Sequence, residues 1–101
     1  MTKILRVTEV EPLDGHVIRV TFSDGAIKDV DVGGLLAAGG VFAPLRDQRG
    51  VFEQVRVNPE TQTVEWPGDV DLDPEVLYGR FGPASGAEIT RRTVRAPAAA
   101  A

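Results

Sequence analysis

The sequence predicts an α+β fold with a small antiparallel sheet of about five strands in two hairpin units and one or two short helices. Three observations lead to this prediction. Apolar and polar residues alternate through residues 17–22, as in a half-buried strand. A hairpin turn signal follows at residues 23–25, Ser-Asp-Gly. At residues 73–75, Asp-Pro-Glu combines an N-cap, a proline suited to the first helical turn and an acidic residue near the positive end of the helix dipole.

Residues 4–13 are expected to form the first strand, because Leu5 and Val7 alternate with polar neighbours before a Pro-Leu-Asp-Gly turn. The second and third strands should form a hairpin around residues 23–25.

The register of that hairpin depends on the length of its loop. A two-residue loop would place Asp29 and Asp31 on the buried face, where unpaired carboxylates are costly. A three-residue loop over residues 23–25, with its glycine in the left-handed conformation, leaves both carboxylates in solvent. It also turns Lys28 inward opposite Val20. We therefore expect the three-residue loop.

The middle of the chain is expected to connect two hairpins. Residues 33–40 begin and end with glycine pairs, which predicts a short helix. Residues 41–47 predict a turn or 3₁₀ segment that places Phe42 and Leu45 in the core.

A second hairpin is predicted from residues 51–57 and 63–66, joined over Asn58-Pro59-Glu60-Thr61-Gln62. Its expected core positions are Val55, Val57, Val64 and Trp66.

The chain length of 101 residues, with 43% hydrophobic and 26% charged residues, fits one globular domain. We assign this domain to residues 1–82, and residues 83–101 to a loosely ordered tail rich in Ala, Arg and Pro. Residues 91–101 carry three arginines and no acidic residue, so the remainder has a formal charge of −4 − 3 = −7.

Composition excludes several function classes. The net charge of −4 argues against electrostatic capture of nucleic acid or an anionic membrane, and favours a small basic protein as partner. The absence of cysteine excludes disulfides and thiolate catalysis. No apolar stretch reaches the ~20 residues of a membrane-spanning helix, and we expect a cytoplasmic protein.

The acidic run that contains Asp69, Asp71 and Asp73 has the opening spacing of a calcium loop. However, Pro74 stands where that loop requires glycine and Arg80 where it requires glutamate, so we assign no metal and no cofactor.

Catalytic groups are sparse. His16 is the single histidine and has no nearby acidic residue at a spacing that would orient it. Of the two serines, Ser23 lies in a tight turn and Ser85 in the tail, so we predict a protein that is not an enzyme.

The order of several short motifs resembles a small bacterial family called domain of unknown function 2442, over roughly residues 4 to 80. The motifs are Phe22-Ser23-Asp24-Gly25, the strand end at Asp31, Leu35-Leu36, Val41-Phe42, Leu45-Arg46-Asp47, Phe52, Val64-Glu65-Trp66-Pro67-Gly68, Asp71-Leu72, Pro74 and Leu77-Tyr78. The resemblance implies an α+β domain without assigned activity. It also implies frequent proximity to a small protein of the domain of unknown function 4160 family, in an arrangement like a toxin–antitoxin pair.

Some members of that family carry a helix-turn-helix region after this domain. Nothing past Tyr78 is long or periodic enough for one, which argues against direct operator binding.

These observations favour a partner-binding module, in which a sheet edge docks the partner and acidic residues attract it. An antitoxin-like role fits this hypothesis. The proposed partner-binding residues are Asp29, Asp31, Asp69 and Asp71. Two alternatives remain open: a structural homodimer, and a small-ligand binder or enzyme that uses the turn of residues 69–73 with His16 or Tyr78.

Overall fold

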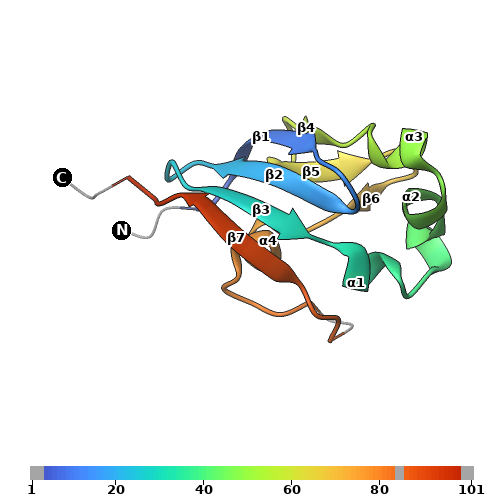
Figure 1. Cartoon of the computed structure of the whole chain (residues 1–101). Coiled ribbons are helices and arrows are strands. Elements are labelled where there is room, and N and C mark those ends of the chain that lie inside the picture. The colour runs from blue at the N-terminus through green and yellow to red at the C-terminus, as the bar shows by residue number, and fades with distance from the viewer. Residues whose placement is uncertain (1–3, 84–85, 99–101) are drawn as a thin grey trace.

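The computed structural model describes residues 4–83 and 86–98 (Figure 1). Within this part of the chain the strands form two antiparallel sheets. One has four strands, in the spatial order β1 (Val7–Pro12), β2 (Val17–Phe22), β3 (Ile27–Asp31) and β7 (Thr90–Arg95). The other has three, in the order β4 (Arg56–Asn58), β5 (Thr63–Trp66) and β6 (Val70–Asp71). The α+β class is confirmed, but the expected sheet of about five strands is divided into two sheets.

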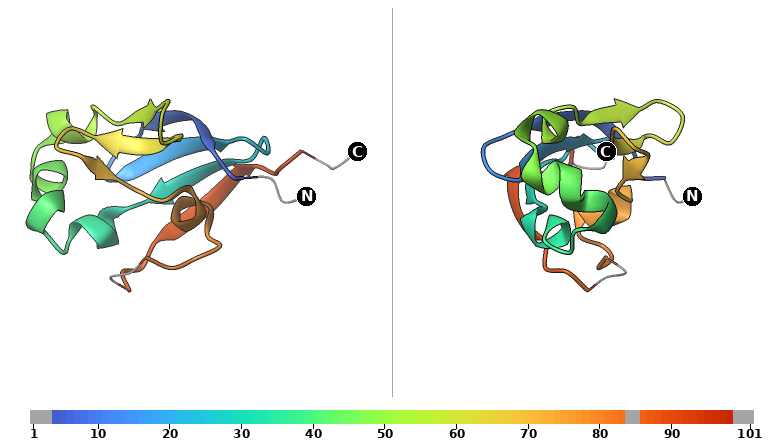
Figure 2. Two further views of the ribbon diagram at one scale, coloured as in Figure 1. Left: turned by 180° about the vertical axis from the view of Figure 1, so that it is seen from behind. Right: turned by 90° about the vertical axis from the view of Figure 1, so that its right-hand side faces the viewer.

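The helical segments are short and more numerous than the one or two expected. They are α1 (Gly33–Leu36), the 3₁₀ helix η1 (Gly40–Phe42), α2 (Ala43–Asp47), α3 (Arg49–Phe52) and α4 (Pro74–Tyr78). Figure 2, which on its left views the molecule from behind, shows α1, η1, α2 and α3 gathered at one end and the smaller sheet in front of the larger one. None of the described helices is long and apolar enough to cross a membrane.

The β2–β3 hairpin has the register that the three-residue loop predicts. Ile18 lies opposite Val30 and Val20 opposite Lys28. Gly25 has a φ of 89°, a left-handed conformation that glycine adopts without steric cost. Because the side chains alternate between faces, this register turns Ile18, Val20 and Val30 into the core.

The hydrophobic core lies between the two sheets and is closed by the helices. Its largest fully buried side chains include Trp66, Phe22, Phe52, Ile18, Leu36, Leu45 and Leu77. The indole Nε1 of Trp66 donates a hydrogen bond of 2.9 Å to the carbonyl oxygen of Phe52. This bond satisfies the polar atom of a buried side chain and fixes β5 against α3.

The predicted strand over residues 51–57 is wrong in its first part. Residues 49–52 form α3, and the strand begins only at Arg56. Phe52 and Val55 are both buried although they lie three residues apart, a spacing that suits a helical turn better than a strand.

The prediction of a loosely ordered tail from residue 83 is wrong for residues 90–95, which form β7. This strand pairs with β3, so that Arg91 lies opposite Val30 and Arg92 opposite Asp29. The guanidinium group of Arg91 donates to the carbonyl oxygens of Val76 and Leu77 in the last turn of α4. Cationic side chains stabilise a helix C-terminus in this way.

Replacing Leu77 by Ala should lower the free energy of unfolding by about 2–5 kcal/mol, because Leu77 is fully buried where α4 meets the core. The matched control is Val41→Ala, since Val41 is 70% exposed and its truncation should cost less than about 0.5 kcal/mol. Urea denaturation of both variants measures the difference. Equal losses would mean that α4 does not pack as described.

Candidate interaction surface

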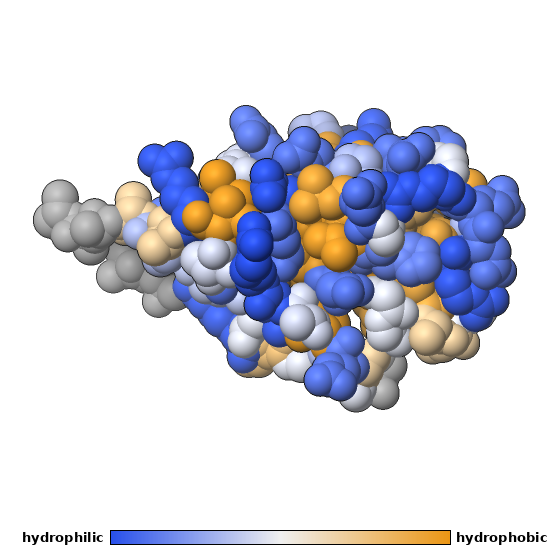
Figure 3. Space-filling view, in the orientation of Figure 1, coloured by the Kyte–Doolittle hydropathy of each residue, from blue (hydrophilic) through white to orange (hydrophobic). Residues whose placement is uncertain are grey.

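The outer face of the four-stranded sheet is the side opposite the core. Figure 1 shows it toward the viewer, with no helix or strand among the described residues lying over it. In Figure 3 the same view shows apolar surface interrupted by charged side chains. The register assigns to this outer face the side chains of Glu9, Glu11, Val17, Arg19, Thr21, Ile27, Asp29, Asp31, Thr90, Arg92 and Arg95.

A row of alternating charges crosses all four strands of this face. It consists of Glu11 on β1, Arg19 on β2, Asp29 on β3 and Arg92 on β7. Arg19 makes two hydrogen bonds to the Asp29 carboxylate, of 2.8 and 3.0 Å. The outer members are looser: Arg19 lies 3.9 Å from Glu11, and Arg92 lies 3.8 Å from Asp29. The charge row therefore compensates most of the charge at the middle of the face.

Asp29 is the least exposed carboxylate of the charge row, with 13% of its side chain accessible. The hydrogen bonds from Arg19 hold the pKa of Asp29 below its ordinary value, although desolvation acts in the opposite direction. The same bonds raise the pKa of Arg19. The Asp29 carboxylate is therefore already bound by Arg19 of the same chain, and a binding partner would have to compete with Arg19 for it.

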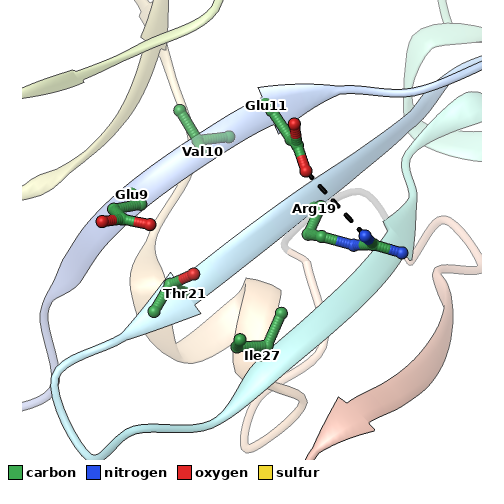
Figure 4. Close-up of a pocket in the computed structure, with 6 residues that line it drawn as sticks. All are labelled: Glu9, Val10, Glu11, Arg19, Thr21 and Ile27. Carbon is green, nitrogen blue, oxygen red and sulfur yellow. Dashed lines mark ion pairs between the residues drawn. The ribbon is translucent and has the colours of Figure 1, made fainter.

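A shallow hollow lies beside the charge row (Figure 4). Its lining residues are Glu9, Val10, Glu11, Arg19, Thr21 and Ile27. Figure 4 shows Glu9 and Glu11 on β1 and Ile27 across from them on β3. Two carboxylates beside an aliphatic side chain form a suitable environment for a long basic side chain, whose charged end and apolar stem need different neighbours.

The structure does not bring the four predicted aspartates into one patch. Asp29 and Asp31 lie on β3 of the larger sheet. Asp71 lies in β6 of the smaller sheet, and Asp69 lies in the turn just before it. Asp31 accepts a hydrogen bond of 2.8 Å from the backbone N–H of Gly33, at the start of α1. Asp69 adopts a φ of 61° in the turn before β6.

Sequence reasoning did not include Glu9, Glu11 and Arg19 among the partner-binding candidates. The alternation that turns Ile18 and Val20 inward already places Arg19 on the outer face, so a signal for it was present. The alternation in β1 could not predict which face Glu9 occupies, because a β-bulge between Val7 and Glu9 shifts the register of that strand.

The residues of the ligand-binding alternative each have a local structural partner. The Tyr78 hydroxyl donates a 2.6 Å hydrogen bond to Asp24, which, together with burial, raises the pKa of Tyr78. Asp73 caps α4 by accepting from the backbone N–H of Glu75. His16 Nε2 lies 3.2 Å from the carbonyl oxygen of Arg46. Over residues 4–83 and 86–98, no group of three His, Cys, Asp or Glu side chains is placed to hold a metal ion.

Comparisons with known proteins give a family and one structural relative. The sequence model of the family described as Protein of unknown function (DUF2442) matches residues 7–83. A crystal structure of Putative DNA Binding Protein NE0471 from Nitrosomonas europaea ATCC 19718 is similar, with 31% sequence identity and a TM-score of 0.58. That alignment covers 67% of this chain and 44% of the other, so more than half of the relative is unmatched. No curated protein matches the chain.

Replacing Asp29 by Asn should destabilise the fold at neutral pH, because the variant loses the charged partner of Arg19. The lowered pKa of Asp29 means that its contribution is complete above about pH 4, the usual value for an unfolded Asp, and is lost as the pH falls through the lower folded value. The difference in unfolding free energy between wild type and Asp29→Asn should therefore shrink below pH 4.

Urea denaturation from pH 7 to pH 2.5 measures this dependence. The control is Asp69→Asn, a substitution at an exposed turn position whose positive φ suits Asn. A difference for Asp29→Asn that stays constant down to pH 2.5 would contradict the assigned role of the Arg19 pair.

Proposed function

Because this chain belongs to the family described as Protein of unknown function (DUF2442), which carries no assigned activity, we propose a role from its geometry. We propose that it is a protein-binding module whose partner docks on the outer face of the four-stranded sheet. The observation that carries the proposal is that this outer face is uncovered by any described element, yet holds the partly buried Val17 and Ile27 among charged side chains. Apolar contacts surrounded by polar groups are typical of protein interfaces.

The chemistry of the hollow supports a basic partner. Glu9 is exposed and makes no ion pair with any described residue, and Glu11 reaches Arg19 only at 3.9 Å. Asp29 holds the Arg19 guanidinium by two bonds, so Arg19 neutralises Glu11 weakly. A lysine or arginine of the partner would find two carboxylates here, and the net charge of −4 would steer it toward the chain.

An antitoxin-like role in the cytoplasm is one form of this proposal. In that case the partner would be a small basic protein made together with this chain, and binding would mask its activity. The support for this finer statement is the acidic charge of the chain, which suits a basic partner.

We propose a binding role rather than an enzymatic one. The groups that could supply acid–base chemistry, Tyr78, His16 and Asp73, are engaged in separate structural contacts. General acid–base catalysis would require such groups to converge on one site.

The first experiment is affinity capture of partners on the tagged, full-length chain from its own cell lysate, at low and at high salt, followed by mass spectrometry. A single small basic protein should be retained at low salt and released at high salt, since exposed charge pairs are screened by ions. Glu9→Lys should weaken retention of that protein by roughly 3- to 10-fold, which is about 0.7–1.4 kcal/mol.

The control for this experiment is Glu60→Lys, which makes the same charge change in the exposed turn between β4 and β5. If the two variants lose the partner equally, net charge and not the outer face determines binding. If nothing is retained by the wild-type chain at either salt concentration, the proposal fails.

DNA binding is a second candidate, favoured by a specific observation. The similar chain from Nitrosomonas europaea is named a putative DNA-binding protein, and β7 of this chain exposes Arg92 and Arg95. Both arginines lie on the outer face, although the net charge of −4 opposes such binding.

Fluorescence anisotropy with a labelled DNA duplex tests this candidate. If β7 binds phosphates, the Arg92→Ala/Arg95→Ala variant should bind more weakly and should reduce the slope of log affinity against log salt by about 1.8, or about 0.9 for each phosphate that is no longer neutralised. Arg56→Ala is the control, since Arg56 is exposed on the other sheet. No anisotropy change with wild type at low salt would exclude this candidate.

A further inference from the structure

We propose that β7 is an exchangeable strand, and that the edge of β3 is a docking site for the β7 of a second copy of this chain. Two copies would then pair by exchanging their C-terminal strands, as in a domain-swapped dimer. This inference does not rest on the partner-binding proposal, because it concerns the pairing of β3 with β7 and not the hollow on the outer face beside β1.

The first observation is that the core closes without β7. Among the described residues, the buried ones all lie between Leu5 and Leu77. Beyond that point, Tyr78 at the end of α4 and then Ala87 and Ile89 pack partly against the core, and none of these three lies in β7. Within β7 itself, Arg91 is half-buried and the other five residues are exposed. A strand that buries so little apolar surface can leave the sheet at a small fraction of the cost of global unfolding.

The second observation is the place where the family match ends. It covers residues 7–83 and therefore stops before β7. Within the matched part, β3 is the edge strand of its sheet, with β2 on one side. An unfilled strand edge presents free N–H and C=O groups and is a template for another strand. In this chain the residues that follow the matched part occupy that template.

The third observation is the chemistry that holds β7. Besides the pairing of β7 with β3, Arg91 donates to the carbonyl oxygens of Val76 and Leu77. Arg92 lies 3.8 Å from Asp29, and the Ala98 N–H donates a 2.8 Å hydrogen bond to the backbone carbonyl oxygen of Asp24. These bonds depend on the sequence of the incoming strand and not on its covalent connection. The β7 of a second copy would supply all of them.

Charge and chain length also suit a second copy. Residues 91–101 carry three positive charges, and the rest of the chain carries −4 − 3 = −7, so the strand of one copy is attracted to the body of another. The connection over residues 79–89 contains three glycines and one proline. Fully extended, it spans about 35 Å, against a radius of gyration of 13.1 Å for the molecule.

In the closed form β7 pairs with β3 of its own chain, and in the exchanged form it pairs with β3 of a second copy. Both forms make the same contacts, so the protein concentration determines the fraction of exchanged dimer. A connection as short as residues 79–89 gives the strand of the same chain an effective concentration in the millimolar range. Exchange should therefore be small in dilute protein and become substantial near 1 mM.

The test uses Asp31→Cys/Thr90→Cys, since these two residues face each other across β3 and β7. The natural chain has no cysteine, so no other thiol interferes. Opposed residues in antiparallel strands lie about 4.5–5.5 Å apart at Cα, within the range of a disulfide. Oxidation in dilute protein should lock β7 onto its own β3.

Light scattering coupled to size exclusion then compares masses at about 1 mM protein. The wild-type chain and the reduced variant should form dimers, and the oxidised variant should remain monomeric until a reductant is added. The control is Glu9→Cys/Thr21→Cys, an opposed pair on β1 and β2 that leaves β7 free and should dimerise when oxidised.

Two outcomes would overturn the proposal. Monomers in the wild-type chain and in both redox states mean that β7 does not exchange. Dimers in both redox states of Asp31→Cys/Thr90→Cys mean that the copies associate through another surface.

A second readout of the same step mixes a size-tagged Asp31→Cys chain with an untagged Thr90→Cys chain at about 1 mM before oxidation. Strand exchange brings residue 31 of one chain opposite residue 90 of the other, so disulfide dimers of one tagged and one untagged chain should exceed dimers of two tagged or of two untagged chains. A random distribution of the three products contradicts it.

Discussion

The register of the β2–β3 hairpin determines which residues this protein buries and which it offers to solvent. With the three-residue turn, Ile18 and Val30 pair inward, and Arg19 and Asp29 pair outward. A shift by one residue would exchange the two faces and bury the ion pair in the core. The hydrophobic core, the charge row and the docking edge of β3 therefore all depend on Gly25 accepting a φ of 89°.

Tyr78 connects this hairpin to α4. Its hydroxyl donates to Asp24 in the turn, its ring packs edge-on against Phe22, and its carbonyl oxygen accepts a 3.0 Å hydrogen bond from the Lys28 ammonium. The Lys28 Nζ also lies 4.1 Å from the centre of the Tyr78 ring, so the charge of this inward-facing lysine is stabilised by both a hydrogen bond and a cation–π contact. Arg91 of β7 binds the same helix end, but the contacts of Tyr78 with the hairpin would still hold α4 if β7 left the sheet.

The parts of the fold that depend on local sequence were predictable, and those that depend on distant partners were not. The alternation around Val20, the loop glycine and the Asp73 cap each carry their signal within a few residues, and the structure agrees with them. β7 has no hydrophobic alternation, because backbone pairing and arginine bonds hold it. The outer face could be predicted strand by strand, but the charge row could not, since it requires the order of strands β1-β2-β3-β7.

Acidic composition alone does not make an acidic interface. Asp29, which looks like a partner-binding carboxylate in the sequence, is held by Arg19 and approached by Arg92, and a partner would have to compete with both. Breaking the half-buried Arg19–Asp29 pair would leave one charge unpaired, and this would destabilise the complex by more than the new contact with the partner would stabilise it. The free carboxylate of Glu9 carries no such cost. Association with a basic partner should therefore begin at β1, at the opposite edge of the sheet from β7, so that partner binding and strand exchange do not exclude each other.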